Sequence, residues 1–158
     1  MPAAPLIEIR VQAGDFDVSA EIDALTKGRA DIGGVASFIG LCRDEGGALS
    51  ALELEHYPGM AERAIRAIAE EAVARFALSA ILAVHRYGKI APGGNIVLVA
   101  AAAGHRHAAF EGAEFLMDYL KTEAPFWKKE HMADGTSGDW VSAKDADDSA
   151  RDRWKGRS

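Results

Sequence analysis

The sequence contains a single cysteine, Cys42, among its 158 residues. One cysteine cannot form a disulfide within the chain, and it cannot supply the thiolates of a cysteine-rich zinc site. We therefore expect a reducing compartment, the cytoplasm. No basic segment followed by an apolar run is present near Met1, and no segment has the length of uncharged sequence needed to span a bilayer. Neither export nor membrane anchoring is predicted.

The sequence also lacks an excess of positive charge. Its formal net charge is −6 at pH 7, which argues against a broad surface for nucleic acid or for anionic membranes, because both partners require a basic face. Three nucleotide and hydrolase motifs are missing as well, namely the phosphate-binding Gly-x-x-x-x-Gly-Lys-Ser/Thr loop, the dinucleotide Gly-x-Gly-x-x-Gly fingerprint and the Gly-x-Ser-x-Gly elbow. We expect no cofactor and no metal, and any catalysis must use lysine, arginine and histidine on an anionic substrate.

The composition, with 49% hydrophobic and 27% charged residues, is typical of a soluble globular domain. We expect one domain over residues 1–143 and a charged tail over residues 144–158, with Trp154 as the only obvious anchor of the tail. Hydrophobic periodicity predicts helices over 18–25, 60–76 and 106–124, and strands over 7–11, 32–40, 49–56, 81–87, 96–103, 127–131 and 140–141. This order predicts an α+β fold, with a largely antiparallel sheet, two long helices packed on it and a small β subdomain.

The most informative stretch runs from Asp118 to Glu130. Pro125 cannot continue a helix, so the helix that carries Lys121 should end near Ala124. If the chain is extended after this corner, Lys128 and Lys129 point to opposite faces. Lysines held around a fixed corner can act as a base, as a nucleophile or as an anion clamp. Taken alone, the residues favour a solvated charge run, and a lysine late in a helix is favoured by the helix dipole alone.

A second cluster, Gly104-His105-Arg106-His107, lies where a buried strand ends and a helix begins. Basic side chains are unfavourable at a helix N-terminus unless an anion binds among them, so the cluster predicts a phosphate or carboxylate site. Neutral, capping histidines explain the same residues equally well. A metal site is the weaker interpretation, because further ligands are missing.

Arg43 follows a predicted strand directly, in a position where scaffolds commonly present binding groups, and a guanidinium suits bidentate anion contacts. Taken alone, a surface ion pair with a neighbouring acid explains Arg43 as well. Cys42 reads as a small buried residue, since no activating partner is evident. His85 lies inside a strand and is interpreted as structural.

These motifs, taken together, resemble the large, catalytic subunit of molybdopterin synthase. The resemblance covers about Val35 to Trp140 and rests on five motifs in the family's order: Phe38-Ile39-Gly40-Leu41-Cys42-Arg43, Leu54-Glu55-His56-Tyr57-Pro58-Gly59-Met60-Ala61, His85-Arg86-Tyr87-Gly88, Gly104-His105-Arg106-His107-Ala108-Ala109-Phe110, and Leu120-Lys121 through Ala124-Pro125-Phe126-Trp127-Lys128-Lys129-Glu130. Cys42 departs from the family pattern, where an aliphatic residue is more usual, and this raises the question of thiol participation.

The resemblance implies a sulfurtransferase of molybdenum cofactor biosynthesis. Such enzymes convert cyclic pyranopterin monophosphate to molybdopterin by installing two dithiolene sulfurs. The sulfur comes from a small ubiquitin-like subunit with a C-terminal Gly-Gly thiocarboxylate. The family fold is α/β with a hammerhead-like subdomain, and two large subunits form a homodimer within a heterotetramer.

Carried over by motif, Lys121 and Lys128 become the catalytic residues. The substrate-binding positions are then Leu41, Cys42, Arg43, His105, Arg106, Lys121, Lys128, Lys129 and Glu130, with His105 and Arg106 provided by the opposite protomer. Two other functions stay open from the residues alone. One is a non-catalytic module that binds a ubiquitin-like tail or an anionic metabolite. The other is a Schiff-base lysine enzyme that acts on a phosphorylated carbonyl compound.

Overall fold

The computed structural model describes residues 4–44, 46–142 and 154. Within this part of the chain, helices and strands alternate much as the periodicity predicts. In chain order they are β1 (Leu6–Gln12), α1 (Val18–Thr26), β2 (Gly34–Leu41), β3 (Leu49–His56), α2 (Met60–Phe76), β4 (Ala80–Arg86), β5 (Gly88–Ile90), β6 (Asn95–Ala103), α3 (Arg106–Thr122) and β7 (Phe126–Met132). The predicted α+β class is confirmed.

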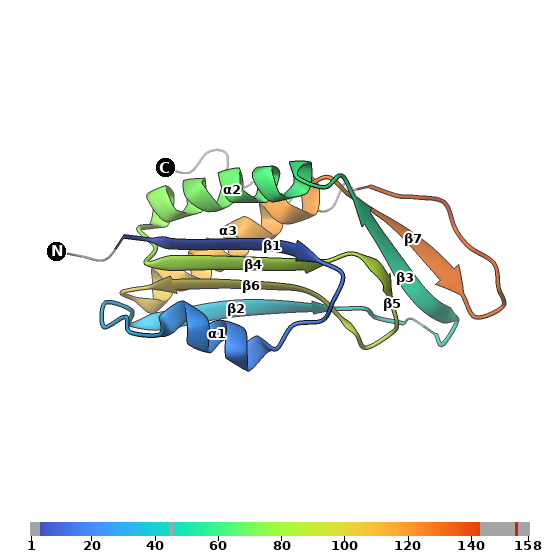
Figure 1. Ribbon diagram of the computed structural model, residues 1–158, viewed down its shortest axis with the longest axis horizontal. Coiled ribbons are helices and arrows are strands. Elements are labelled where there is room, and N and C mark those ends of the chain that lie inside the picture. The colour runs from blue at the N-terminus through green and yellow to red at the C-terminus, as the bar shows by residue number, and fades with distance from the viewer. Residues whose placement is uncertain (1–3, 45, 143–153, 155–158) are drawn as a thin grey trace.

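The larger sheet has four strands in the order β1-β4-β6-β2 (Figure 1). β4 pairs antiparallel with β6, and β6 pairs antiparallel with β2, whereas β1 runs parallel to β4. The sheet is thus largely antiparallel, as expected. Its two edges are β1 and β2, and β6 lies inside the sheet.

Helices cover both faces of this sheet, with α2 and α3 on one side and α1 on the other (Figure 1). Side chains of a strand alternate between faces, and β6 accordingly contributes to two cores. One core joins α2 and α3 to Val97, Val99, Ala101 and Ala103. The other joins α1 to Leu98, Ala100 and Ala102. The uninterrupted apolar run in this strand is therefore explained by burial on both faces.

A smaller sheet, in the order β5-β3-β7, extends from one end of the larger one (Figure 1). β3 pairs antiparallel with both neighbours. Leu52, Leu54 and His56 share one face of β3, and Leu54 packs with Cys42 and Ile90 in a third, small core. This sheet is the predicted small β subdomain.

Two details differ from the sequence-based expectation. β5 was not predicted, because three residues are too few to show a period and Gly88 before Lys89 adopts a positive φ of 89°. Met60, an apolar residue within the helix predicted over 60–76, is 49% exposed at the first position of α2. No helix among the described residues is long and apolar enough to cross a membrane.

Trp154 confirms the expected anchor, because its side chain is only 1% exposed. The indole contacts the rings of Phe76 and Phe115, with centroids 5.9 and 5.7 Å away. Its Nε1 donates a hydrogen bond to Asp118 Oδ2 at 2.5 Å. Arg75 Nη2 donates to the carbonyl oxygen of Trp154 at 2.9 Å. The expected tail at 144–158 otherwise lies outside the described residues.

Gly33, just before β2, is required by close backbone packing. A Cβ at this position would lie 2.0 Å from the carbonyl oxygen of Gly104, and a backbone atom cannot move aside as a flexible side chain can. We expect Gly33→Ala to destabilise the fold by about 2–3 kcal/mol, measured by urea denaturation. Gly14→Ala is the matched control, since a Cβ there meets nothing within 4 Å. Equal stabilities of the two variants would contradict this account.

Candidate active site

The predicted corner around Pro125 is present. α3 ends at Thr122, and the Glu123 N–H donates to the carbonyl oxygen of Tyr119 at 2.6 Å. β7 starts at Phe126, directly after the proline. Lys121 thus stands on the last turn of the helix, and Lys128 on the strand that follows the corner.

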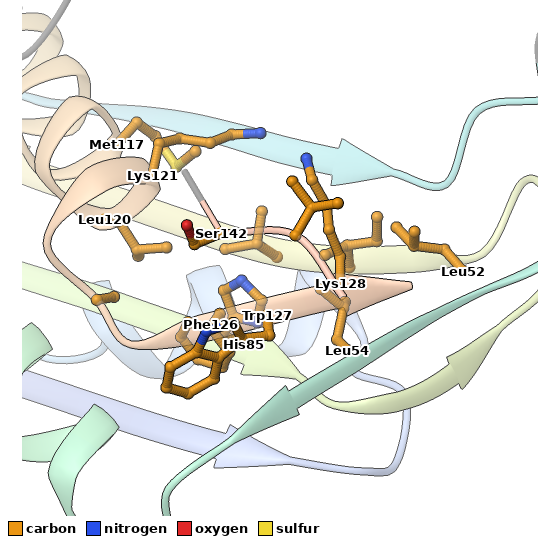
Figure 2. Close-up of a pocket in the computed structure, with 14 residues that line it drawn as sticks. Leu52, Leu54, His85, Met117, Leu120, Lys121, Phe126, Trp127, Lys128 and Ser142 are labelled. Atoms are coloured by element: carbon orange, nitrogen blue, oxygen red, sulfur yellow. The ribbon is translucent and has the colours of Figure 1, made fainter. Parts of the chain in front are cut away.

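The two lysines line one pocket of about 110 Å³. Figure 2 shows their amino groups directed toward one another above a mostly apolar lining. α3, β3, β6 and β7 all contribute to this lining, which comprises Leu52, Leu54, His85, Ile96, Val97, Met117, Leu120, Ala124, Phe126, Trp127, Val141 and Ser142. Two ammonium groups that line one mostly apolar pocket favour an anionic ligand, because opposite charges attract more strongly where water is scarce.

The side chains of β7 alternate as the sequence predicts. Lys128 lines the pocket, whereas Lys129 lies outside the lining, with its Nζ 5.6 Å from the ring centroid of Trp140. Glu130 is exposed and lies opposite Leu52 of β3. Lys128 is therefore the β7 lysine whose amino group reaches the pocket with that of Lys121.

After β7 the chain turns back along the same strand. Val141 and Lys128 exchange two backbone hydrogen bonds of 2.9 and 2.8 Å, so the strand predicted at 140–141 is a single bridge. His131 contacts this return segment through Nδ1, 2.9 Å from Ser137 Oγ, while its Nε2 lies 2.8 Å from Glu53 Oε1 of β3. The return segment brings Val141 and Ser142 to the pocket wall.

The floor of the pocket is aromatic. The rings of His85 and Phe126 are stacked, with centroids 3.9 Å apart and planes at 15°. His85 is 6% exposed, and burial lowers the pKa of its imidazole to about 4, with a smaller contribution from the charge of Lys121. His85 is thus neutral at pH 7.

Arg43 and the His105-Arg106 pair lie at different ends of the molecule. Arg43 follows β2 at the end where Leu41 pairs with Asn95, near the β6 residues of the pocket. Arg106 begins α3, whereas Lys121 is in its last turn, so about 22 Å of helix separates them. The pocket of one chain therefore does not contain the His105-Arg106 pair of the same chain.

Comparisons with known proteins agree on one family. A sequence model of the MoaE protein family matches residues 11–123. The molybdopterin synthase catalytic subunit of Rhizobium meliloti strain 1021 is 67% identical over 155 residues, 98% of this chain and 99% of that protein. The chain belongs to the MoaE family.

Solved structures of the MoaE family share the fold. The molybdopterin biosynthesis MoaE protein from Burkholderia ambifaria MC40-6 has a TM-score of 0.82 and 48% identity, covering 97% of this chain and 100% of that one. Molybdopterin synthase from Staphylococcus aureus has a TM-score of 0.76 and 26% identity, covering 84% and 95%. The resemblance drawn from the five motifs is thereby confirmed, and with it a role as an enzyme of molybdenum cofactor biosynthesis.

Cys42, where the chain departs from the family pattern, is buried in the small third core and is not part of the pocket lining. Its side chain is 3% exposed and packs with Leu54 and Ile90. Burial raises the pKa of the Cys42 thiol, and the thiolate is the reactive form. Its backbone N–H and carbonyl are bonded to Gly94 and Gly93. The structure offers no support for thiol participation, and Cys42→Ser should leave turnover close to that of the native protein.

His105 and His107 have different surroundings at the start of α3. His105 occupies the N-cap position without a side-chain capping bond, and His107 Nε2 lies 3.1 Å from Glu111 Oε1. Among the residues that the structure describes, neither histidine belongs to a group of three or more His, Cys, Asp or Glu side chains that could hold a metal ion. Arg106 is exposed, and so remains accessible to a ligand or to another chain.

Sequence reasoning missed part of the pocket. His85 had been interpreted as structural, although its alternation with Ile81 and Ala83 already placed it on the face of β4 that α2 and α3 cover. A strand was predicted at 140–141, but the sequence did not show that Val141 and Ser142 fold back to the pocket wall. All nine predicted site positions stay predictions, of which Lys121 and Lys128 are the two whose side chains line the pocket.

Proposed function

We propose that this protein is the catalytic subunit of a molybdopterin synthase, and that the pocket between Lys121 and Lys128 is where sulfur is transferred. The single observation that carries the proposal is that a proline corner directs two lysines from different elements into one apolar pocket. The substrate is cyclic pyranopterin monophosphate. The sulfur donor is the C-terminal Gly-Gly thiocarboxylate of a small ubiquitin-like subunit.

The two lysines suit this chemistry in two ways. Their positive charges would hold the thiocarboxylate and stabilise negative charge that develops during attack on the substrate, an effect that is stronger in a water-poor pocket. An amine near the reacting atoms can also donate or accept protons. A glycine tail is thin enough to enter a pocket of about 110 Å³ as an extended chain.

A second copy of the chain would complete the site. β2 is an edge strand with exposed apolar side chains, and Phe110 of α3 is also exposed, although such edges are normally protected. The exposed set on β2 comprises Val35, Phe38, Ile39 and Leu41, which are 37–54% exposed. We infer a homodimer across this edge, with a small subunit at each end in a heterotetramer.

The direction of β2 explains how the partner contributes. A two-fold axis at this edge would set the two β2 strands antiparallel, so the start of one strand would lie beside the end of the other. Gly34 at the start lies against Arg106, whose Cα would be 3.6 Å from a Cβ placed there. The partner's end of the strand leads to Arg43 and the pocket. His105 and Arg106 of one protomer would therefore bind the substrate phosphate beside Lys121 of the other.

Reconstituted sulfur transfer tests the whole proposal. Purified protein, thiocarboxylated small subunit and cyclic pyranopterin monophosphate should yield molybdopterin, and a small subunit with an ordinary carboxylate tail should yield none. Binding without turnover would instead support the non-catalytic module. Covalent trapping of a phosphorylated carbonyl compound by borohydride, without any protein partner, would support the Schiff-base enzyme.

We also propose a cytoplasmic location, which cell fractionation tests.

A heterodimer of two inactive variants tests the shared site. Co-expression of differently tagged Lys121→Ala and Arg106→Ala chains, followed by purification on both tags, isolates dimers with one chain of each kind. If Arg106 acts across the interface, one of the two sites is intact, and about half of the native turnover should return. If Arg106 acts within its own chain, both sites are damaged, and the heterodimer should be no more active than its parents.

A further inference from the structure

His85 presents an acceptor to the pocket that nothing in the described part of the chain uses. Its Nδ1 lies 2.8 Å from the carbonyl oxygen of Arg86. A carbonyl oxygen can only accept, so Nδ1 must carry the proton and donate it. In the neutral ring, Nε2 then has a free lone pair; His85 lines the pocket, and the only hydrogen bond of its ring within the described part of the chain is the one at Nδ1.

The imidazole cannot easily turn away from this arrangement. It stacks nearly parallel on the ring of Phe126, and its Nδ1 is hydrogen-bonded to the backbone carbonyl oxygen of Arg86. Burial keeps the pKa of His85 far below neutrality. The acceptor is therefore fixed in position and persists at neutral pH.

The two lysines of the pocket have the opposite hydrogen-bonding role, whereas the hydroxyl of Ser142 can donate or accept. The ammonium groups of Lys121 and Lys128 only donate, and most of the remaining lining is apolar. A ligand that offers only anionic oxygens could satisfy the lysines and would leave Nε2 unpaired. A ligand that combines an anion with an N–H donor would satisfy both ends of the pocket (Figure 2).

We propose that His85 Nε2 accepts a hydrogen bond from an N–H group of the bound ligand, and so selects ligands that carry both an anion and an N–H donor. The identity of the ligands rests on the proposed function. Two sources have the required chemistry, namely the ring and amino N–H groups of the pterin and the last backbone amide of the glycine tail.

Three substitutions separate the hydrogen bond from the packing. His85→Phe keeps a ring against Phe126 and removes both nitrogens. His85→Asn retains a polar group near Nδ1 without an acceptor at the Nε2 position. His85→Gln places an amide oxygen close to that position. Loss of one hydrogen bond should weaken binding of the dependent ligand by about tenfold in the Phe and Asn variants, while the Gln variant should bind close to the native level.

Dissociation constants are measured by calorimetry, separately for the pterin substrate and for the small subunit with a carboxylate tail. Weaker binding of the pterin alone assigns the hydrogen bond to the pterin, and weaker binding of the small subunit alone assigns it to the tail amide. Unchanged dissociation constants for both ligands in His85→Phe, or a Gln variant as impaired as the Asn variant, would overturn the proposal.

The measurement of binding needs no turnover, so a native protein that binds both ligands without converting them contradicts the proposed function alone. If it binds neither ligand, both proposals fail.

Nitrogen NMR of the native protein gives a readout that does not depend on ligands. The His85 ring should show a protonated Nδ1 and an unprotonated Nε2 at neutral pH, with the Nε2 signal shifting when the dependent ligand binds. The opposite tautomer would overturn the proposal, because Nε2 would then be a donor.

Discussion

Replacing Lys121 or Lys128 by alanine is expected to lower molybdopterin formation by at least about 100-fold. Each change removes one of the two cations that line the pocket, and under the proposed function it would remove a charge partner of the thiocarboxylate and a proton donor for the reaction. The measurement is single-turnover formation of product with the thiocarboxylated small subunit. Folding should be retained, because Lys121 is exposed and Lys128 is half-buried on the strand β7.

The control for this prediction is Lys27→Ala, an exposed lysine that follows α1 on the opposite face of the sheet. It should turn over substrate at the native rate. Lys→Arg variants of Lys121 and Lys128 distinguish binding of an anion from proton transfer, because arginine keeps the positive charge but does not give up its proton. Retained activity in Lys121→Arg would indicate an anion clamp, and lost activity would indicate a proton carrier or nucleophile. Full dithiolene formation by both alanine variants would rule out the assignment of catalysis to this pocket.

Trp154→Ala should destabilise the fold by about 3–5 kcal/mol, as large-to-small changes of buried aromatic residues do. The indole is almost fully buried against Phe76 and Phe115, and its N–H donates to Asp118. Urea denaturation followed by circular dichroism should show a lower midpoint with little change in slope. Since Asp118 is one turn before Lys121 in α3, catalytic activity should be lost at a correspondingly lower temperature.

Trp140→Ala is the matched control for the tryptophan. This side chain is 43% exposed and contacts the Lys129 ammonium, a cation–π contact worth about 0.5–1 kcal/mol at an exposed site. Trp154→Phe should fall between the two, because it keeps much of the packing and loses the hydrogen bond to Asp118. Similar stabilities for Trp140→Ala and Trp154→Ala would show that Trp154 does not anchor the chain.

The long, periodic elements could be predicted from sequence because their patterns report which face is buried. The apolar stripe of α2 and the continuous run of β6 both follow from packing against the larger sheet. The proline corner was equally predictable, since proline acts through local covalent geometry. Strand pairing was harder. Nothing local indicates that β1 runs parallel to β4, because that contact joins segments far apart in the sequence.

In the candidate site, too, the residues that local sequence brings together were predictable, and those that join through contacts between distant segments were not. Lys121 and Lys128 lie near each other in the sequence, and a local argument brings them together. His85 joins them because the end of β4 lies against the start of β7, as the stack of His85 on Phe126 shows, and a strand pattern does not reveal that contact. The separation of Arg106 from Lys121 was implicit in the predicted helix length, and under the proposed function this separation is the reason that a second protomer would be needed.

In the proposed dimer, the length of helix α3 sets the distance between a residue of one active site and a residue of the other. Its first residue, Arg106, would serve one pocket of the dimer and its last turn, with Lys121, the other. Each inserted or deleted residue would shift one end by about 1.5 Å and rotate it by about 100°, so it would disturb both centres together. Changes of length are therefore expected to be tolerated in surface loops, such as the turn at 46–48, and to be eliminated within this helix.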